Sequence, residues 1–536
     1  MILQGKRVAL PPAPVVHQQF ETHARTAPDA VAVVHAGRQV TYAELDAHAN
    51  RFAHFLRARG HGRGTTVGVC LDYSVELLVA ILGTLKAGAA YVPLDPAYPP
   101  ARLQLLLGQV PGLALVAASA ATAAMVEAAP CEVVDLAGLD LLALPATSPG
   151  VAVSGEDLCY AVFTSGSTGT PKLTAVRHAG WFNLMRWLRL EYGLTARSHH
   201  LVVSAFGFDL SQRALMTPLF CGATQHLLAS RNFDAMMAYR ALREHDIRVV
   251  HCASSTLYVL VDWELARGGT ALARLDHVLF GGEALKSERL EEWARRPGRA
   301  CTLLHQYGVA ECTDVATSYD LSRHWRGGGD IAPVGTPAHN TDIHLLDARL
   351  RPVGPGQDGE ICIAGAGVGA GYLGAAGPEN ARFTVVDVDG EPVRLYRTGD
   401  RGRIDAGGDL VVAGRMDAQV KVRGMRIDPG DIERALGRLP GIREAAVAVT
   451  PGAGGEGELT AFLLPAAGAP DEDAVRAGLL ASLPRNMVPA RFVTVAHLPL
   501  SPHGKVDRAA LAAAAAPPAS RAAAARPHAP EEQAAR

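Results

Sequence analysis

Residues 160–172 read YAVFTSGSTGTPK, and this stretch carries the strongest signal of fold in the chain. Apolar residues run directly into serine, threonine and glycine, which is typical of a buried strand that ends in a loop. Gly166 and Gly169 let a ligand approach the backbone, and Lys172 adds positive charge. Hydroxyl and amide groups for an anion come from Thr164, Ser165, Ser167 and Thr168. The stretch predicts a phosphate-binding loop, and a solvated turn is the alternative.

The length and charge of the chain indicate a large enzyme. Its 536 residues exceed what one hydrophobic core usually supports, so two or more domains are expected. The 51 basic and 53 acidic residues give a formal charge of −2, which offers no electrostatic basis for binding nucleic acid or a membrane surface. We therefore expect no nucleic-acid partner and no membrane partner.

The cysteines and the N-terminus predict a cytoplasmic location. The eight cysteines form no CxxC pair, which is typical of free thiols in a reducing compartment. The first twelve residues, MILQGKRVALPP, lack the apolar core of a signal peptide. The longest apolar stretch is interrupted by Lys86, so no membrane span is expected.

Helical and strand patterns alternate in the first hundred residues. Residues 44–60 have the spacing of an amphipathic helix, residues 65–71 read as a buried strand, and residues 74–88 read as a second helix that ends at glycine. This alternation predicts layered α/β structure with parallel sheet. From about Leu511 alanine, proline and arginine replace the core pattern, which predicts a linker.

Asp400 is a further candidate before any family is considered. It follows a Thr-Gly turn after an apolar strand, where a short carboxylate can accept hydrogen bonds from ribose hydroxyls. An Asx turn is the alternative.

Eleven motifs occur in a fixed order and carry a family resemblance. The chain resembles the adenylation domains of nonribosomal peptide synthetases, in the superfamily that also holds acyl-CoA synthetases and luciferases. Besides the phosphate loop, the motifs are VTYAEL at Val40, LKAGAAYVPLDP at Leu85, FDLS at Phe208, FGGEAL at Phe280, QYGVAEC at Gln306, GEICIAGAGVGAGYL at Gly359, YRTGD at Tyr396, GRMDAQVKVRGMRID at Gly414, LPRNMVP at Leu483 and HGKVDR at His503.

The resemblance implies a two-domain α/β fold, with a large N-terminal body of layered α/β subdomains and a small, mobile α+β lid. The implied domains are residues 1–416, residues 417–512 and an Ala/Pro-rich linker, residues 513–536, toward a missing carrier domain. Asp417 corresponds to the hinge, and the loop near Gly424 would move toward the thiol tunnel.

The implied reaction joins an amino-acid carboxylate to the α-phosphate of ATP, releases pyrophosphate, and passes the aminoacyl group to the phosphopantetheine thiol of a peptidyl carrier protein. Two anions must meet, so a cation has to offset their repulsion. Lys505 in HGKVDR corresponds to that cation, and an exposed lysine in a polar turn is the alternative. The family also suggests a small MbtH-like helper protein as an optional partner.

The resemblance assigns the nucleotide site residue by residue. Glu311 would hold Mg²⁺ against the phosphates. Tyr307 would lie against adenine, with a buried core tyrosine as a compatible alternative. Asp400 and Arg415 would hold the ribose. The other side of the adenine ring would be lined by Gly282, Glu283 and Ala284.

Asp209 in FDLS matches the aspartate that pairs with the α-ammonium group of amino-acid substrates. A helix N-cap is the alternative. Arg213 and Asp314 indicate a polar substrate side chain, because an apolar one would leave both partly unsatisfied, unless they pair with each other. The implied side-chain pocket comprises Leu210, Arg213, His251, Leu279, Gly281, Gln306, Asp314 and Val315.

Four departures from the family pattern leave the charged groups in place. Leu173 stands where glycine is usual, His305 and His503 replace asparagines, and Val412 replaces a tyrosine that packs on the ribose. Two other classes stay open: a free-standing acyl-CoA or amide ligase, which should lack the Asp209 ammonium partner, and a non-catalytic scaffold. Amino-acid-dependent pyrophosphate exchange separates the three.

Overall fold

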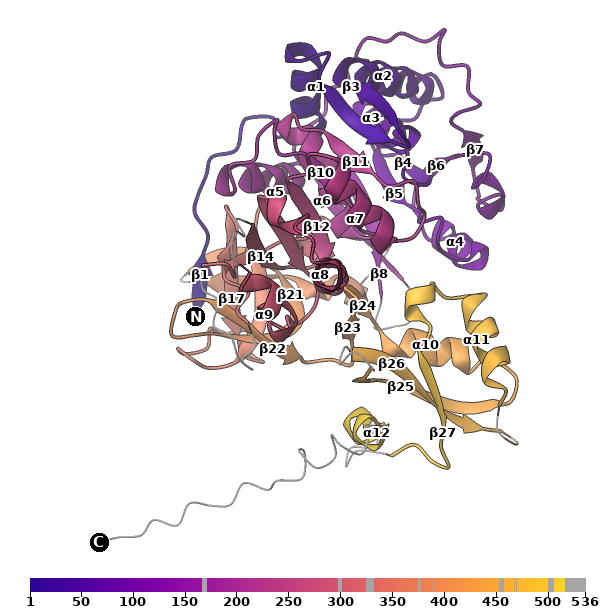
Figure 1. The fold of residues 1–536 in the computed structure, drawn as a ribbon, viewed down its shortest axis with the longest axis vertical. Helices are drawn as coiled ribbons and strands as arrows, with labels where there is room; N and C mark the ends of the chain where they lie inside the picture. Colours follow the sequence, from indigo (N-terminus) through magenta and orange to yellow (C-terminus); the bar gives the residue numbers. More distant parts are fainter. Residues whose placement is uncertain are drawn as a thin grey trace. The chain divides into compact units, whose positions relative to one another are not determined.

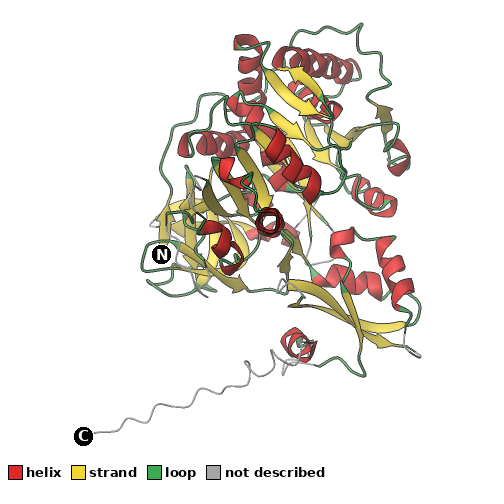
Figure 2. Ribbon diagram, in the orientation of Figure 1, coloured by secondary structure: helices red, strands yellow, loops and turns green. Residues whose placement is uncertain are grey.

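The computed structural model describes residues 1–165, 171–296, 301–323, 332–374, 377–388, 390–452, 457–466, 468, 470–499 and 506–515. The chain divides into two compact units, one of residues 1–165 and 171–426 and the other beginning at Ile427. Figure 1 follows the chain through both units, and Figure 2 shows the repeated alternation of helices and strands within the first.

A nine-stranded sheet forms one layer of the first unit. Its central strands are parallel, as the βαβ pattern predicts, and the strands pair in antiparallel fashion at both edges. In spatial order the strands are β16 (Thr336–Pro337), β15 (Thr317–Asp320), β14 (Thr302–Tyr307), β13 (His277–Gly281), β12 (Val249–Ala253), β10 (His200–Val202), β11 (Gln225–Leu227), β2 (Val31–His35) and β3 (Arg38–Thr41).

A second, seven-stranded sheet carries the strand that leads into the predicted phosphate loop. That strand, β8, pairs with β9 in antiparallel fashion, so the loop residues 165–171 connect two neighbouring strands. In spatial order the strands are β19 (Gly371–Leu373), β9 (Lys172–Arg177), β8 (Leu158–Thr164), β5 (Ala90–Pro93), β4 (Thr66–Cys70), β6 (Leu113–Ala118) and β7 (Glu132–Asp135).

A helical layer joins these two sheets through one hydrophobic core. Two of its helices contact the nine-stranded sheet, two contact the seven-stranded sheet, and the pairs also pack on each other. The helices that lie deepest in this layer meet apolar surface on both faces and are buried on nearly every side, whereas the first two helices keep a partly exposed polar face. The helices are α1 (Val16–Thr26), α2 (Tyr42–Ala58), α3 (Val75–Lys86), α5 (His178–Glu191) and α6 (Asp209–Cys221).

The outer faces of the two sheets are covered by further helices. The outer face of the nine-stranded sheet meets α7 (Ala235–Glu244), α8 (Ser254–Arg267) and α9 (Glu288–Ala294), and that of the seven-stranded sheet meets α4 (Pro100–Leu107). None of the helices in the described part of the chain has the length and apolar character needed to span a membrane. All eight cysteines are free, and seven of them are buried.

The predicted helix–strand–helix segment near the N-terminus is confirmed as α2, β4 and α3. The start of α2 is fixed by Thr41, whose hydroxyl accepts from the Glu44 amide at 3.2 Å while the Glu44 carboxylate accepts from the Thr41 amide at 2.8 Å. This reciprocal capping satisfies two backbone donors that the helix itself leaves free. Gly88 follows α3 in the left-handed region, at φ +83°, and ends that helix.

The last sheet of the first unit is largely antiparallel and supplies β21, which carries Asp400. Its strands are β1 (Ile2–Gln4), β17 (Thr341–Leu346), β18 (Gly359–Gly365), β21 (Glu391–Ile404) and β20 (Phe383–Val388), and β22 (Leu410–Arg415) pairs with β21. A short pair, β23 (Val420–Val422) and β24 (Met425–Ile427), follows.

The second unit is a small α+β structure. It contains β25 (Ile442–Pro451), β26 (Gly457–Pro465) and β27 (Arg491–Thr494) in one sheet, together with α10 (Pro429–Leu436), α11 (Glu472–Leu480) and α12 (Arg508–Ala515). β25 and β26 are antiparallel, whereas β26 and β27 are parallel. The size and composition of this unit match the predicted small C-terminal domain.

Two predicted domain boundaries differ from the structure. The division falls after Arg426 rather than after residue 416, because side chains between Arg415 and Arg426 bond to the first unit, as described below. The predicted linker from residue 513 is helical at its start, since α12 continues to Ala515. Leu511 is 3% exposed and packs on Phe462, so the last turns of α12 belong to the core of the second unit.

Candidate active site

The carboxyl ends of the parallel strands β12, β13 and β14 form the floor of the candidate site. His251 is in register with Leu279, and Gly281 is in register with Gln306. Side chains two residues apart on a strand share a face, so all four positions lie on the same face of the sheet. A Cβ atom at Gly281 would come within 2.1 Å of the Gln306 carbonyl oxygen, so this position requires glycine.

Arg213 of α6 lies over this face and pairs with Asp314. Its Nε is 2.8 Å from Oδ2 of Asp314, and its Nη1 donates to the side-chain oxygen of Gln306. Arg213 is only 2% exposed. Burial raises the pKa of Asp314 to about 7, although the charge of Arg213 opposes that shift. The pairing that the sequence left open is therefore present. We call Arg213, Asp314, Gln306 and His251 the Arg213 cluster.

A strained turn brings Asp314 back toward the sheet. Thr313 and Asp314 follow the 3₁₀ helix Ala310–Cys312, and both adopt left-handed backbone conformations, at φ 61° and 72°. The hydroxyl of Thr313 donates to the Gly367 carbonyl at 2.6 Å and helps to hold the turn. Non-glycine residues in this region cost free energy and concentrate at functional sites. No feature of the sequence predicted this turn.

His251 is a fully buried side chain on β12. Neither ring nitrogen forms a hydrogen bond within the described residues, and the ring stacks on His200 with centroids 5.2 Å apart. Burial, together with the charge of Arg213, holds the pKa of His251 well below its usual value. The neutral imidazole therefore offers one unused donor and one unused acceptor.

Asp209 begins α6, four residues before Arg213, so both side chains lie on one face of that helix. Its Oδ1 accepts from the amide of Leu210 at 2.8 Å, and among the described residues it forms no ion pair. Burial raises the pKa of Asp209. The N-cap residue is Phe208, so the alternative that Asp209 is the N-cap is wrong. Val315 is buried in the same core as α6.

A second set of charges surrounds Asp400 in β21. Its Oδ2 accepts from the Tyr307 hydroxyl at 2.8 Å, and its Oδ1 accepts from Arg415 at 2.5 Å. Arg415 also donates to both carboxylate oxygens of Asp417, at 2.7 and 2.8 Å, and to Gln419 at 3.0 Å. Asp400 bonds partners on other strands, so the Asx-turn alternative is wrong. These five residues form the Arg415 cluster.

Within the Arg415 cluster, Asp417 is held by two arginines. Arg382 donates to its Oδ2 at 3.2 Å, beside the paired bonds from Arg415. Burial alone would raise the pKa of Asp417, but the two guanidinium groups outweigh it and lower the pKa to about 2. Asp417, the predicted hinge residue, is therefore also a hydrogen-bond partner of Arg415, the predicted ribose-binding residue.

Lys421 is a charged group that sequence reasoning missed. Its ammonium lies 3.9 Å from Oδ2 of Asp400 and 5.1 Å from the centroid of the Tyr307 ring. Burial lowers the pKa of Lys421, and Asp400 opposes that shift. The only signal for it was the basic character of the motif QVKVRG.

Glu311 is buried and ion-paired. Its Oε1 accepts from the Tyr372 hydroxyl at 2.7 Å, and Arg426 donates to Oε1 and Oε2 at 3.2 and 3.3 Å. Burial raises the pKa of Glu311, but Arg426 and Tyr372 reverse the shift and leave the pKa below its usual value. The Glu311 carboxylate is therefore ionised, and its two oxygen atoms could serve as metal ligands. Arg426 and Tyr372 were not predicted from the sequence.

The Glu311 carboxylate could hold magnesium only together with a phosphate ligand. Among the described residues, no group of three or more histidines, cysteines or carboxylates could hold a metal by itself. Magnesium in phosphate chemistry uses one or two protein carboxylates and takes its other oxygens from phosphate and water. A single ionised carboxylate at Glu311 matches that requirement.

The predicted phosphate loop is described only at its two ends. Thr164 ends β8, and its hydroxyl donates to the Lys172 carbonyl at 3.4 Å. Ser165 donates to the carbonyl of Arg426 at 2.9 Å. The Lys172 ammonium lies 5.2 Å from the centroid of the Tyr372 ring. Gly166, Ser167, Thr168 and Gly169 lie outside the described residues, as do His503 and Lys505.

The predicted adenine residues follow β13 and meet the turn at Gly424. Gly424 has φ +77° and donates its amide to Oε1 of Glu283. A Cβ atom at Gly282 would lie 3.0 Å from the Gly424 carbonyl oxygen. Ala284 follows as an exposed residue. His305, on the neighbouring strand, already uses Nδ1 at 2.9 Å from the Pro333 carbonyl.

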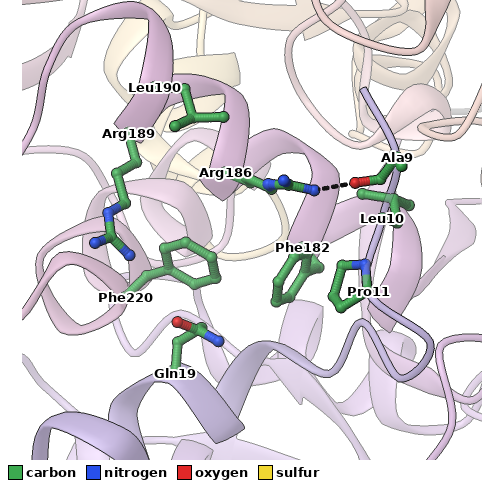
Figure 3. A pocket seen from close by; sticks show the side chains of 9 residues that line it. All are labelled: Ala9, Leu10, Pro11, Gln19, Phe182, Arg186, Arg189, Leu190 and Phe220. Carbon is green, nitrogen blue, oxygen red and sulfur yellow. Dashed lines mark hydrogen bonds between the residues drawn. The ribbon is translucent and has the colours of Figure 1, made fainter. Parts of the chain in front are cut away.

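A separate pocket of about 370 Å³ lies elsewhere in the first unit (Figure 3). Phe220 lines it from the end of α6 opposite to Asp209, and Arg186 of α5 donates to the Ala9 carbonyl at its rim. Phe182, Leu10 and Pro11 add apolar lining. None of the residues predicted from the sequence lines this pocket.

Comparison with known proteins decides the family. The model of the family described as "AMP-binding enzyme" matches residues 20–373, which is more than half of the chain. The chain belongs to the AMP-binding enzyme family. The dimodular nonribosomal peptide synthase of Bacillus subtilis is 37% identical over 92% of this AMP-binding enzyme, which spans 21% of that protein. Syringomycin synthase SyrB1 of Pseudomonas syringae pv. syringae is 34% identical over 96% of the enzyme and 84% of that protein.

A solved structure supports the same assignment. It is that of holo-PA1221, an NRPS protein containing adenylation and PCP domains, bound to a vinylsulfonamide inhibitor; this protein is 28% identical to the AMP-binding enzyme, with a TM-score of 0.81. The alignment covers 93% of this chain and 84% of that one. The predicted resemblance to nonribosomal peptide synthetase adenylation domains, the α/β fold class and the assignment as an adenylating ligase are confirmed.

Proposed function

We propose that this AMP-binding enzyme activates an α-amino acid, with a polar side chain, by joining its carboxylate to the α-phosphate of ATP and releasing pyrophosphate. The observation that carries the proposal is Asp209, a half-buried carboxylate with a raised pKa and no ion-pair partner among the described residues. A buried carboxylate without a cation is costly, and an α-ammonium group would supply the missing charge.

The reaction brings a carboxylate against a phosphate, so positive charge has to gather at the point of attack. Lys505 is proposed to bridge the two anions, and Lys172 to contact the outer phosphates. The hydroxyl and amide groups of Thr164 to Gly169 are proposed to hold the phosphates in place. These groups orient the attacking oxygen opposite the leaving pyrophosphate.

The nucleoside is proposed to lie against the Arg415 cluster. Each carboxylate oxygen accepts two hydrogen bonds, so Asp400 can accept from ribose hydroxyls while it keeps Tyr307 and Arg415. Tyr307 would lie against adenine opposite Gly282, Glu283 and Ala284. Glu311 would hold magnesium, which supplies charge neutralisation to the phosphates when it is bound.

A carrier protein is the proposed acceptor of the activated amino acid. The likeness to an NRPS protein that contains adenylation and PCP domains supports this step. Asp417 is the proposed hinge, and the Gly424 loop the proposed approach for the phosphopantetheine thiol. An MbtH-like helper protein is an optional partner. Because the reaction consumes ATP and passes its product to a carrier, we place it in the cytoplasm.

The test is pyrophosphate–ATP exchange with a panel of amino acids and their des-amino analogues. We expect exchange with amino acids alone, and a loss of about 100-fold or more in Lys505→Ala, because the transition state loses its bridging charge. Lys6→Ala, at an exposed site, is the matched control and should keep full exchange. Exchange with acids that lack an amino group would instead favour a CoA or amide ligase, and no exchange with any acid would favour a scaffold.

A further inference from the structure

We propose that the substrate's side chain is uncharged and ends in a carboxamide or hydroxyl, and that Asp314 enforces this by neutralising Arg213. This inference rests on the proposed amino-acid activation and narrows its substrate class. It depends on two separate observations of the Arg213 cluster. The charges of Arg213 and Asp314 already offset each other, and the neutral polar atoms of His251 and Gln306 lack hydrogen-bond partners among the described residues.

The charge of Arg213 is offset by the nearby carboxylate of Asp314. Nε of Arg213, on α6, lies 2.8 Å from Oδ2 of Asp314, in the turn between β14 and β15. An acidic side chain would have to compete with Asp314 for the guanidinium, and a basic one would have to compete with Arg213 for the carboxylate. In either case one buried charge would be left over, which is costly in a medium of low dielectric constant.

The unsatisfied groups are His251 and Gln306. The side-chain oxygen of Gln306 accepts from Arg213, but its buried amide nitrogen has no hydrogen-bond partner among the described residues, although the Tyr192 hydroxyl lies near it. Both ring nitrogens of His251 are also unused, and that side chain is fully buried on the same face. Together they offer donors and an acceptor without net charge.

This combination selects against apolar substrates too. A substrate methyl group in contact with His251 and Gln306 would leave their hydrogen-bonding atoms buried and unpaired. Sites built to hydrogen-bond a substrate reject an analogue that lacks the polar atoms more strongly than an apolar site rejects a similar shape. A carboxamide or hydroxyl both donates and accepts, so it can meet these groups directly.

The experiment compares sets of side chains of similar shape in the exchange assay on the full chain. The sets are asparagine, aspartate and leucine; glutamine, glutamate, lysine and methionine; and threonine and valine. In the set that fits best, we expect kcat/KM for the neutral polar member to exceed that of the others by about 10-fold or more. A preference for an acidic, basic or apolar amino acid would overturn the inference and leave the proposed function standing.

A charge variant tests the role of Asp314. Asp314→Asn leaves Arg213 without its counter-charge, so the ratio of kcat/KM for the acidic member over its amide should rise by about 10-fold or more. The double variant Arg213→Leu, Asp314→Leu removes both charges together and should not gain the acidic substrate. An unchanged ratio in Asp314→Asn would overturn the role given to Asp314. Exchange with no amino acid at all would instead contradict the proposed function.

Discussion

The Arg415 cluster and the Arg213 cluster are both buried and charged, but they differ in how fully their polar atoms are paired. In the Arg415 cluster, both oxygens of Asp400 and both oxygens of Asp417 accept hydrogen bonds. In the Arg213 cluster, the ion pair is present but His251 and one end of Gln306 have no partner among the residues that the structure describes. Among the described residues, one network has its carboxylate oxygens fully bonded, and the other leaves buried polar atoms without partners.

Under the proposed function, this difference separates two tasks within one site. A fully bonded network in a medium of low dielectric constant is rigid and stabilises the fold. It suits the part of the site that meets the same nucleotide in every turnover. Unpaired buried groups cost stability and are retained where a ligand repays them. They suit the part that discriminates between substrates.

The largest effect should follow from opening the complete network. Arg415→Ala leaves the buried carboxylate of Asp400 and the half-buried carboxylate of Asp417 without their shared cation, so the free energy of unfolding should fall by about 3 kcal/mol. Urea denaturation followed by tryptophan fluorescence measures this change, because all five tryptophans precede residue 427 and report on the first unit. Exchange activity should fall as well.

Arg401→Ala is the control for this variant. Arg401 lies on the same strand as Asp400, but it is half-exposed and pairs with Asp358 at 3.4 Å on the surface. Its removal should change the free energy of unfolding by less than about 1 kcal/mol. Equal losses in the two variants would show that the Arg415 cluster contributes no more than a surface ion pair.

A smaller effect, on activity rather than on stability, should follow from neutralising Asp209. Burial raises the pKa of Asp209, so its charge costs the folded protein free energy that an uncharged amide of the same shape does not. Asp209→Asn should therefore keep the thermal stability while kcat/KM in amino-acid-dependent exchange falls by about 30-fold or more, because the ammonium group loses its counter-charge.

Asp234→Asn is the matched control for Asp209. Asp234 also lies at a helix start, where it accepts from the Met237 amide at 2.9 Å, and asparagine caps a helix as well as aspartate does. Neither stability nor exchange should change. If Asp209→Asn lost stability and kept its kcat/KM, Asp209 would be a structural residue.

The sequence predicted the scaffold and the types of charged residue better than their pairing. The helix pattern at residues 44–60 and the glycine after α3 are local signals, and the structure has both elements. Whether Arg213 and Asp314 pair was left open, because the left-handed turn at Thr313 and Asp314 has no glycine to indicate it. Long-range partners were also invisible, as Arg426 and Glu311 are separated by 115 positions.

The smallest effect is a difference in acid sensitivity beside the Arg213 cluster. Burial lowers the pKa of His200, which stacks on His251, to about 3. Below pH 6.5 the unfolded chain binds a proton at this residue that the folded protein does not, so this contribution to stability is lost as the pH falls from 6.5 toward 3. The slope for one such group is at most about 1.4 kcal/mol per pH unit.

Thermal melts of the wild type and His200→Phe at several pH values between 4.5 and 7.5 measure this slope. The variant should lose less stability than the wild type on acidification between pH 6.5 and 4.5. Asp314 titrates in the opposite sense, since a raised carboxyl pKa costs stability as the pH rises toward 7, but it is present in both proteins and cancels in the comparison. In the Arg415 cluster, Asp417 has a pKa of about 2, so its contribution is lost only below about pH 4. Identical slopes in the two proteins above pH 4.5 would show that His200 finds a proton-accepting partner on folding, and that the unpaired character of this region does not persist in solution.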